Sequence, residues 1–228
     1  MQPEELRKAV GNFIHSCRPR PVLFRRLFRR YADRLGGRIL EIGPEYPPYY
    51  SAPCVKLDLC DRYGHGRYRV DVVGDACAMP FRDESFSTVV CLEVMEHVES
   101  PEALLGEIRR VMRSGGTLFF SIPMAWLYHP IPLDRMRLTS QGVAAMLEKH
   151  GFRVLRVHRV VGVLGFVVTM LYFMLMARIN RLPLNPLRRG MLMLNWALFL
   201  PLFLISIATE RLQPKDIYIT NFCVAEKP

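Results

Sequence analysis

Residues 38–43 read Arg-Ile-Leu-Glu-Ile-Gly, and the rest of the chain is expected to fold around this stretch. Ile39, Leu40 and Ile42 form a short apolar run that stops at Gly43. Such a run is typical of a buried parallel strand that turns into a helix. Open sheets of parallel strands bind nucleotides in the crevice outside the carboxyl ends of their strands. The stretch therefore predicts a nucleotide-type site next to Gly43.

A second apolar run, at residues 55–59, carries the acidic residue Asp58. A carboxylate offers two acceptor oxygens to two adjacent hydroxyl groups, such as the diol of a ribose. Strand, glycine turn, strand and acid in this order indicate a nucleoside site, without indicating any particular reaction.

The composition predicts one ordinary domain with a basic surface. The chain has 228 residues, of which 50% are hydrophobic, and a formal net charge of +10. A basic balance suits nucleic acid, an anionic membrane or an acidic substrate. We expect no nucleic-acid partner, because the sequence has no base-reading motif and no sign of an aromatic-lined groove. Residues 1–20 lack the apolar core of a signal peptide, which predicts a cytoplasmic protein.

The six cysteines are scattered, with no C-x-x-C pair and no metal-ligand spacing. This pattern is typical of small buried apolar residues in a reducing compartment, and it predicts no metal site.

Strands alternate with helices along most of the chain. Residues 1–37 read as two helices, and the second has an apolar face and an arginine face made by Arg25, Arg26, Arg29, Arg30 and Arg34. That face is either a solvated outer surface, which we favour, or a surface for anionic lipid. Further strands are expected at residues 68–76, 85–92, 117–122, 152–161 and 216–224, with helices at 100–113 and 139–150. The order predicts an α/β fold, with a Rossmann-like, doubly wound, mostly parallel seven-stranded sheet at 38–228.

An apolar insertion is expected at residues 160–210, before the last strand. Residues 160–177 and 190–209 contain no charged side chain. Eighteen helical residues reach about 27 Å, barely the hydrocarbon thickness of a bilayer. A spanning hairpin would carry Arg178, Arg181, Arg188 and Arg189 across the membrane, against the positive-inside preference. We predict a helical hairpin that dips into one leaflet or lies at the interface; a buried helical pair or a dimer interface is the alternative.

Six motifs occur in an order that resembles one enzyme family. They are residues 39–43, Asp58, residues 74–76 with 79–81, residues 90–98 (Val-Cys-Leu-Glu-Val-Met-Glu-His-Val), residues 109–116, and residues 151–152. This series is similar to class I S-adenosylmethionine-dependent methyltransferases over residues 36–160 and the final strand. Residues 132–139 also resemble the Pro-x-Asp-x-x-Arg-x-Thr motif of a bacterial group of that family. These residues read Pro-Leu-Asp-Arg-Met-Arg-Leu-Thr, in which Asp134, Arg137 and Thr139 keep their order.

The resemblance implies S-adenosylmethionine as cofactor and a role for each matching residue. Glu41 and Gly43 would shape the loop under the methionine part of the cofactor. Asp58 would bind the ribose, and Leu59 would lie against the adenine.

The resemblance extends to the next two strand ends. Asp75 would accept a hydrogen bond from the adenine amino group, with the Ala76 backbone beside it. Leu92 would lie near the sulfonium. The loop after Gly43 departs from the usual Gly-x-Gly, because Glu45 stands where a glycine lets the backbone approach closely.

Methyl transfer from a sulfonium needs alignment and no metal, but a hydroxyl acceptor must lose a proton. His97 and His129 are the candidate bases. The alternative for His97, which we favour slightly, is a structural histidine bonded to the backbone; His129 is expected in a loop on the acceptor side.

We therefore expect a membrane-associated, metal-independent methyltransferase that acts on a small-molecule or lipid- or glycan-linked acceptor. A nicotinamide oxidoreductase is the competing enzyme class, disfavoured because the full G-x-G-x-x-G is missing. A membrane-associated scaffold with the same fold and no turnover is the competing non-enzyme class, supported by Glu45. The oligomeric state is left open.

Overall fold

A computed structural model describes residues 18–44, 48–60, 62–63, 68–128, 133–183 and 185–228. The first predicted helix of residues 1–37 lies outside this part of the chain. The described residues form two compact units, one of residues 18–26 with 160–219 and the other of residues 27–159 with 220–228. Each unit is described by itself.

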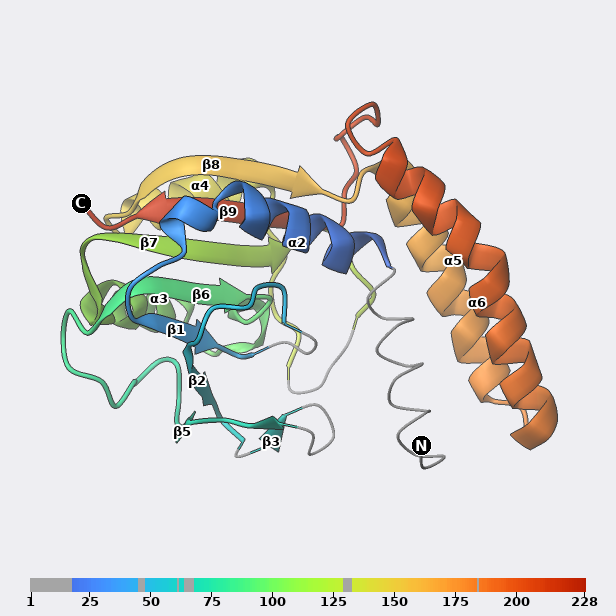
Figure 1. Ribbon diagram of the computed structural model, residues 1–228, viewed down its shortest axis with the longest axis horizontal. Coiled ribbons are helices and arrows are strands. Elements are labelled where there is room, and N and C mark those ends of the chain that lie inside the picture. The colour runs from blue at the N-terminus through green and yellow to red at the C-terminus, as the bar shows by residue number, and fades with distance from the viewer. Residues whose placement is uncertain (1–17, 45–47, 61, 64–67, 129–132, 184) are drawn as a thin grey trace. The chain divides into compact units, whose positions relative to one another are not determined.

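The larger unit is built on the predicted seven-stranded sheet (Figure 1). In spatial order its strands are β5 (Val72–Val73), β2 (Val55–Asp58), β1 (Ile39–Ile42), β6 (Phe86–Leu92), β7 (Met112–Pro123), β9 (Thr220–Glu226) and β8 (Arg153–Val160). Neighbours from β5 to β7 are parallel, whereas β9 runs antiparallel to β7. The predicted α/β fold class is therefore confirmed, with its mostly parallel, doubly wound sheet.

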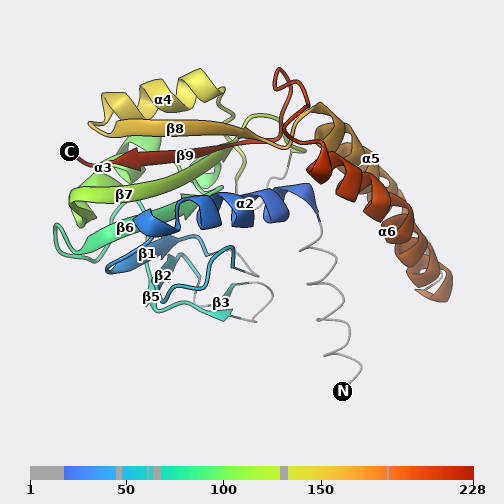
Figure 2. The same ribbon diagram turned by 45° about the horizontal axis from the view of Figure 1, so that its top comes forward.

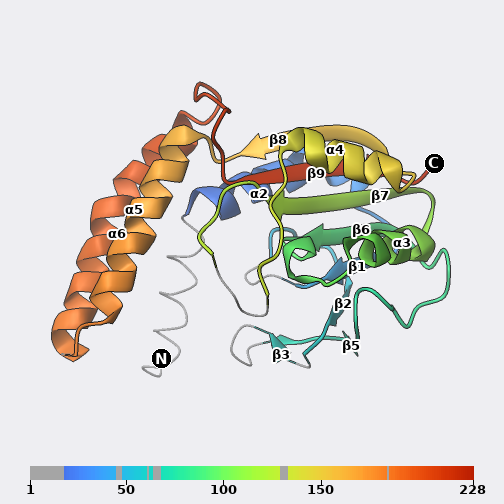
Figure 3. The ribbon, with the colours of Figure 1, turned by 180° about the vertical axis from the view of Figure 1, so that it is seen from behind.

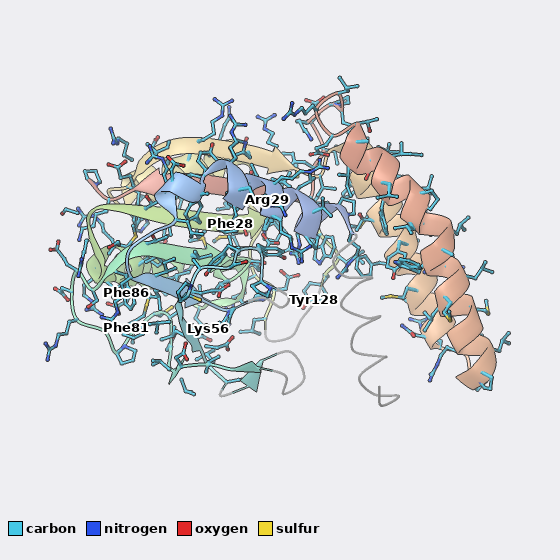
Figure 4. All side chains as sticks on the ribbon, viewed as in Figure 1. Phe28, Arg29, Lys56, Phe81, Phe86 and Tyr128 are labelled. Atoms are coloured by element: carbon cyan, nitrogen blue, oxygen red, sulfur yellow. The ribbon has the colours of Figure 1, made fainter. Side chains whose placement is uncertain are left out.

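Helices cover both faces of this sheet. In the views of Figures 2 and 3, α3 (Pro101–Val111) and α4 (Ser140–Lys149) lie on one face, and residues 27–30, the end of α2 (Pro19–Arg30), lie on the other. Phe28 of α2, labelled in Figure 4, has its ring centroid 5.1 Å from that of Phe119 and 5.4 Å from that of Phe222. Ser100 caps α3 as predicted, because its Oγ accepts a hydrogen bond from the Ala103 N–H at 3.2 Å.

One predicted strand, at residues 68–76, is divided in two. β4 (Tyr68–Arg69) pairs antiparallel with β3 (Arg62–Tyr63) in a separate ribbon, and only β5 joins the main sheet. Asp71 separates them: its Oδ2 accepts from the Lys56 N–H at 2.8 Å, and its own N–H donates to the Lys56 carbonyl at 3.0 Å. The Asp71 side chain thus accepts the Lys56 N–H in place of a backbone carbonyl, and regular pairing between β2 and β5 begins only after Asp71.

The smaller unit contains the predicted hairpin, made of α5 (Val163–Asn180) and α6 (Asn185–Ala208). The two helices lie side by side in all three ribbon views (Figures 1, 2 and 3). Tyr172 of α5 packs between Phe199 and Phe203 of α6, with ring centroids 5.7 and 5.5 Å away. By length and composition alone, both helices could cross a membrane.

The chain after α6 caps the start of α5. The Glu210 carboxylate accepts hydrogen bonds from the N–H groups of Val161 and Gly162, at 3.0 and 3.1 Å. The Gln213 Oε1 accepts from the Leu164 N–H at 3.0 Å. These contacts satisfy donors that a helix N-terminus otherwise leaves without partners, so both ends of the hairpin are tied together.

Candidate active site

The register of the parallel strands brings predicted cofactor residues to one edge of the sheet. Ile42 at the end of β1 pairs with Leu57 of β2 and with Cys91 of β6. The residues that follow these three in the chain are Gly43, Asp58 and Leu92. The carboxyl ends of these strands therefore meet where open α/β sheets bind nucleotides.

Gly43 turns the chain sharply as it leaves β1. Its φ is +61°, in the left-handed region that glycine adopts at little cost. A Cβ placed on Gly43 would lie 2.5 Å from Cγ2 of Val94, in the loop after β6. The turn therefore depends on glycine for two independent reasons, backbone conformation and close packing against Val94.

Asp58 closes β2 with its side chain half-buried. Its Oδ1 accepts a hydrogen bond from the Cys60 N–H at 3.2 Å, which holds the carboxylate in a local turn. The next residue, Leu59, is 66% exposed, an unusual amount for a leucine directly after a sheet strand. An acid and an exposed apolar side chain thus stand together at the sheet edge.

Asp75 follows β5 and is exposed. Its Oδ1 accepts from the Cys77 N–H at 2.8 Å, another turn closed by a side chain. Ala76 between them is buried. Burial, reinforced by the Asp75 charge, raises the pKa of the Cys77 thiol, so this cysteine stays protonated at neutral pH.

Glu41 has a side chain that points into the protein beneath the Gly43 turn, and the residue is only 4% exposed. The Cys54 thiol lies 3.4 Å from the Glu41 Oε2 and donates to it. Burial and the Glu41 charge raise the pKa of Cys54 to about 11. Burial, with Glu41 again contributing, also raises the pKa of Tyr50. Both groups therefore stay neutral beside this carboxylate at physiological pH.

Glu93, which comes directly after Leu92, adopts a conformation that is rare for residues other than glycine. Its φ is +55°. Its Oε1 accepts hydrogen bonds from the hydroxyl groups of Ser121 and Thr220, each at 2.7 Å. Both hydroxyl residues are fully buried, and they come from two other strands. Strained backbone held by surrounding contacts is a frequent feature of functional sites.

His97 lies in a 3₁₀ helix, Met95–His97, just beyond β6. Its Nδ1 contacts the carbonyl oxygen of Leu133, and its Nε2 is 3.9 Å from the Glu96 Oε1. A proton on Nδ1 leaves Nε2 as the basic nitrogen. The contact between His97 Nδ1 and the Leu133 carbonyl is what a structural histidine would make, and it also leaves Nε2 able to accept a proton. His129, the other predicted base, lies outside the described residues, as does Glu45.

The residues that resemble the Pro-x-Asp-x-x-Arg-x-Thr motif have structural partners. Both Asp134 carboxylate oxygens accept from the Arg137 guanidinium, one of them at 2.6 Å and the other more closely. The Asp134 side chain is 2% exposed. Thr139 caps α4 by accepting from the Gly142 N–H at 3.1 Å. These residues hold the segment between β7 and α4 in place.

Sequence reasoning missed Glu93, Ser121 and Thr220 as parts of the site. The sequence shows Glu93 only as one residue of the motif at residues 90–98. No neighbouring residue predicts a left-handed backbone at this position. Its hydroxyl partners lie 28 and 127 positions further along the chain. Among the residues that the structure describes, no three His, Cys, Asp or Glu side chains converge as metal ligands.

Comparison with known sequences agrees with this geometry. Residues 51–120 match the family described as Methyltransferase domain. Sterol 24-C-methyltransferase ERG6B of Gibberella zeae is 33% identical over 92 residues, which are 37% of this chain and 24% of that protein. The ubiquinone biosynthesis O-methyltransferase of Xanthomonas oryzae pv. oryzae is 41% identical over 54 residues, 24% of this chain and 22% of that protein. The chain thus spans only about a quarter of the length of these relatives.

Solved structures show the same fold at low sequence identity. The cyclase SpnF superposes with a TM-score of 0.56 at 19% identity, covering 90% of this chain and 81% of SpnF. Phosphoethanolamine N-methyltransferase 2 of Haemonchus contortus, solved with S-adenosyl-L-methionine, gives 0.56 at 15% identity, covering 96% of this chain and 57% of that protein. Because one of the two is a cyclase, the fold alone does not define a reaction. Residues 51–120 thus match a methyltransferase domain, and the chain as a whole has the fold of solved S-adenosylmethionine-dependent methyltransferases, as the resemblance of the six motifs predicted.

Proposed function

We propose that the protein is an S-adenosylmethionine-dependent methyltransferase. The observation that carries this proposal is the meeting of Gly43, Asp58 and Leu92 at one edge of the sheet, within a chain whose residues 51–120 match a methyltransferase domain. Glu41 beneath the turn and Asp75 with Ala76 beyond β5 complete the cofactor site that we infer.

The residues fit an adenosyl cofactor in a definite order. Asp58 has a second carboxylate oxygen beside the one used by Cys60, and this geometry suits a ribose diol. The exposed Leu59 side chain offers an apolar surface for adenine. Asp75 is exposed and can accept from the adenine amino group. Leu92 lines the methyl end, where an apolar wall excludes water.

S-adenosylmethionine supplies the electrophilic methyl group: the acceptor bonds to the methyl carbon as the carbon–sulfur bond breaks, and S-adenosylhomocysteine leaves. The protein supplies alignment, which can lower a barrier by roughly 7–11 kcal/mol. An acceptor hydroxyl also loses a proton. We assign His97 Nε2 as the candidate base, with His129 as the alternative, because the Leu133 contact fixes the His97 ring.

We further propose that Glu93 orients the acceptor. Replacement with glutamine keeps an acceptor oxygen for Ser121 and Thr220, removes the negative charge and replaces the other carboxylate oxygen with an NH2 group. Glu93→Gln is expected to lower methyl transfer about tenfold or more, while the free energy of unfolding changes by less than about 1 kcal/mol. Equal S-adenosylmethionine affinity in calorimetry serves as the control, and unchanged methyl transfer would remove Glu93 from the site.

The acceptor that we propose is a small molecule or a lipid- or glycan-linked molecule at a membrane surface. Support comes from the apolar hairpin of residues 160–210, which we take as an insertion into a methyltransferase domain at 38–228, with residues 1–37 as a separate N-terminal segment. A cytoplasmic, peripherally or monotopically bound enzyme would meet such an acceptor at the bilayer.

Calorimetry with S-adenosylmethionine tests the cofactor, and transfer of labelled methyl from it into a membrane lipid extract tests the acceptor. Binding and label incorporation are expected. Absence of binding at millimolar cofactor would refute the methyltransferase proposal, and binding of NADH instead would favour the oxidoreductase. Cofactor binding without transfer to any extract fraction would favour the inactive scaffold.

Removing the hairpin should release a soluble, cofactor-binding core. The ends of the insertion are adjacent, since the Ile219 N–H donates to the Val160 carbonyl at 3.2 Å. A variant with residues 162–208 replaced by a short Gly-Ser linker is expected to stay in solution without detergent and to keep its affinity for S-adenosylmethionine. Fractionation and calorimetry measure both properties; a full-length chain that is equally soluble without detergent would contradict the membrane assignment.

A further inference from the structure

The α5–α6 hairpin buries polar side chains beside its aromatic cluster of Tyr172, Phe199 and Phe203, and it exposes apolar side chains on its outer surface. Thr169, Asn195 and Ser206 are each at most 3% exposed, and the Asn195 Nδ2 donates to the Tyr172 carbonyl at 3.5 Å. The outer surface carries large apolar side chains that are more than half exposed, including Leu171, Met174, Leu187, Met193, Leu194 and Leu198. A helical pair in water carries mostly polar side chains on its outer surface, whereas helices in lipid expose apolar side chains and often place small and polar residues between them.

Charge on the hairpin has one sign. Residues 160–209 contain no acidic residue, and Arg178 and Arg181 are exposed where α5 ends and the chain turns toward α6. Two further arginines contact the hairpin: the Arg18 guanidinium lies 5.3 Å from the Phe173 ring centroid in α5, and the Arg26 Nη1 donates to the Ile207 carbonyl, near the end of α6, at 3.4 Å. This surface complements an anionic partner.

The positions of these arginines limit how deeply the hairpin can enter a bilayer. Phe173 lies about 15 Å along α5, so only about 8 Å of helix separates the level of Arg18 from Arg178. The hydrocarbon core is about 30 Å thick. An end-on hairpin would place arginine side chains within it at one level or the other, whereas a hairpin that lies flat lets the exposed Arg178 and Arg181 reach the phosphates.

We propose that the hairpin lies in the plane of an anionic bilayer, with its apolar side chains in the outer part of one leaflet and its arginines on lipid phosphates. This inference rests on the proposed function and names its partner as an anionic lipid surface. Each arginine near such a surface strengthens partitioning about fivefold, and salt weakens the effect.

Flotation of the full chain with vesicles tests the charge requirement. Vesicles that mix phosphatidylcholine with phosphatidylglycerol are expected to carry the protein at least tenfold better than phosphatidylcholine alone. The double variant R178Q/R181Q should bind the mixed vesicles about 25-fold more weakly. The matched control, R82Q/R156Q, removes the same charge from the other unit and should bind as the parent does. Equal binding to both vesicle types, or equal losses in the two variants, would overturn the proposal.

Trp196 reports the depth independently. It lies near the middle of α6, so a spanning hairpin would hold it close to the bilayer centre, and a flat one would hold it near the headgroups. In a Trp126→Phe background its fluorescence should be quenched more by lipids brominated near the headgroup than by lipids brominated near the chain ends. The opposite order would refute the flat arrangement.

Two further results separate this inference from the proposed function. If the chain rises with neither type of vesicle and sediments as a dimer, a second copy of the chain covers the apolar surface. That result would overturn the lipid proposal. Calorimetry on the same preparation reports cofactor binding. If the protein binds the cofactor but does not float with vesicles, only the lipid proposal is contradicted. If it floats with vesicles but does not bind the cofactor, only the methyltransferase proposal is contradicted.

Discussion

Alanine at Gly43 is expected to destabilise the protein by about 2–5 kcal/mol and to abolish measurable S-adenosylmethionine binding. The left-handed backbone costs an alanine about 1–2 kcal/mol, and overpacking costs about 1–3 kcal/mol more. The new Cβ would lie 2.5 Å from Cγ2 of Val94, a stiff β-branched side chain that cannot swing away. Because the turn would form the cofactor loop, its displacement should affect affinity as well as folding. Denaturant unfolding and calorimetry measure the two effects.

Gly106 provides the matched control for this substitution. It lies within α3, and a Cβ there would meet no atom within 4 Å. Gly106→Ala should therefore stabilise the protein by about 0.5–1 kcal/mol through helix propensity and leave cofactor affinity unchanged. Adding Val94→Ala to Gly43→Ala should restore the part of the folding free energy that is lost to overpacking. It should not restore the part that is lost to the left-handed backbone. If Gly43→Ala is as stable as the parent, the tight turn does not exist as described.

Alanine at Asp58 is expected to weaken S-adenosylmethionine binding about 100-fold or more with little change in stability. Each hydrogen bond to a charged group contributes about 1.5–3 kcal/mol, and a ribose diol would make two. Among the described residues, the backbone N–H that the carboxylate accepts from is that of Cys60, in a half-exposed turn. Its loss should therefore cost about 1 kcal/mol of folding free energy. Calorimetry and thermal unfolding of the same samples separate affinity from stability.

Asp71 is the matched control for Asp58. It also accepts a backbone N–H, that of Lys56 at 2.8 Å, but it precedes β5 and therefore lies at the opposite end of its strand from the proposed site. Asp71→Ala should reduce stability by about 1 kcal/mol and leave cofactor affinity intact. Parallel losses of affinity and stability in Asp58→Ala would indicate that its carboxylate is only structural.

Much of the fold could be predicted because its signals are local. The apolar run at residues 39–42 ends at a glycine, and β1 does the same. Ser100 followed by Pro101 indicated a helix start, and Thr139 indicated another; both side chains cap their helices. The uncharged stretches at residues 160–177 and 190–209 indicated the hairpin. Each signal lies within a few residues of the structure that it predicts.

Other features depend on contacts that no local pattern contains. The predicted strand at residues 68–76 is divided because Asp71 bonds to Lys56, a residue on another strand. β9 is placed between β7 and β8, antiparallel to β7, by pairing between distant segments. A window of sequence shows that a segment is extended, but its neighbours and direction depend on the rest of the chain.

The sequence by itself determined the alternation of strands and helices, the candidate cofactor acids at strand ends, and an apolar hairpin that carries only positive charge. Tertiary structure alone decided that Glu93 is held in a left-handed conformation, since its partners Ser121 and Thr220 approach only when three strands assemble. It also decided which hairpin residues face one another and at what level Arg18 meets α5. The reason is that backbone propensity acts between neighbours in the chain, whereas packing and hydrogen bonding act between neighbours in space.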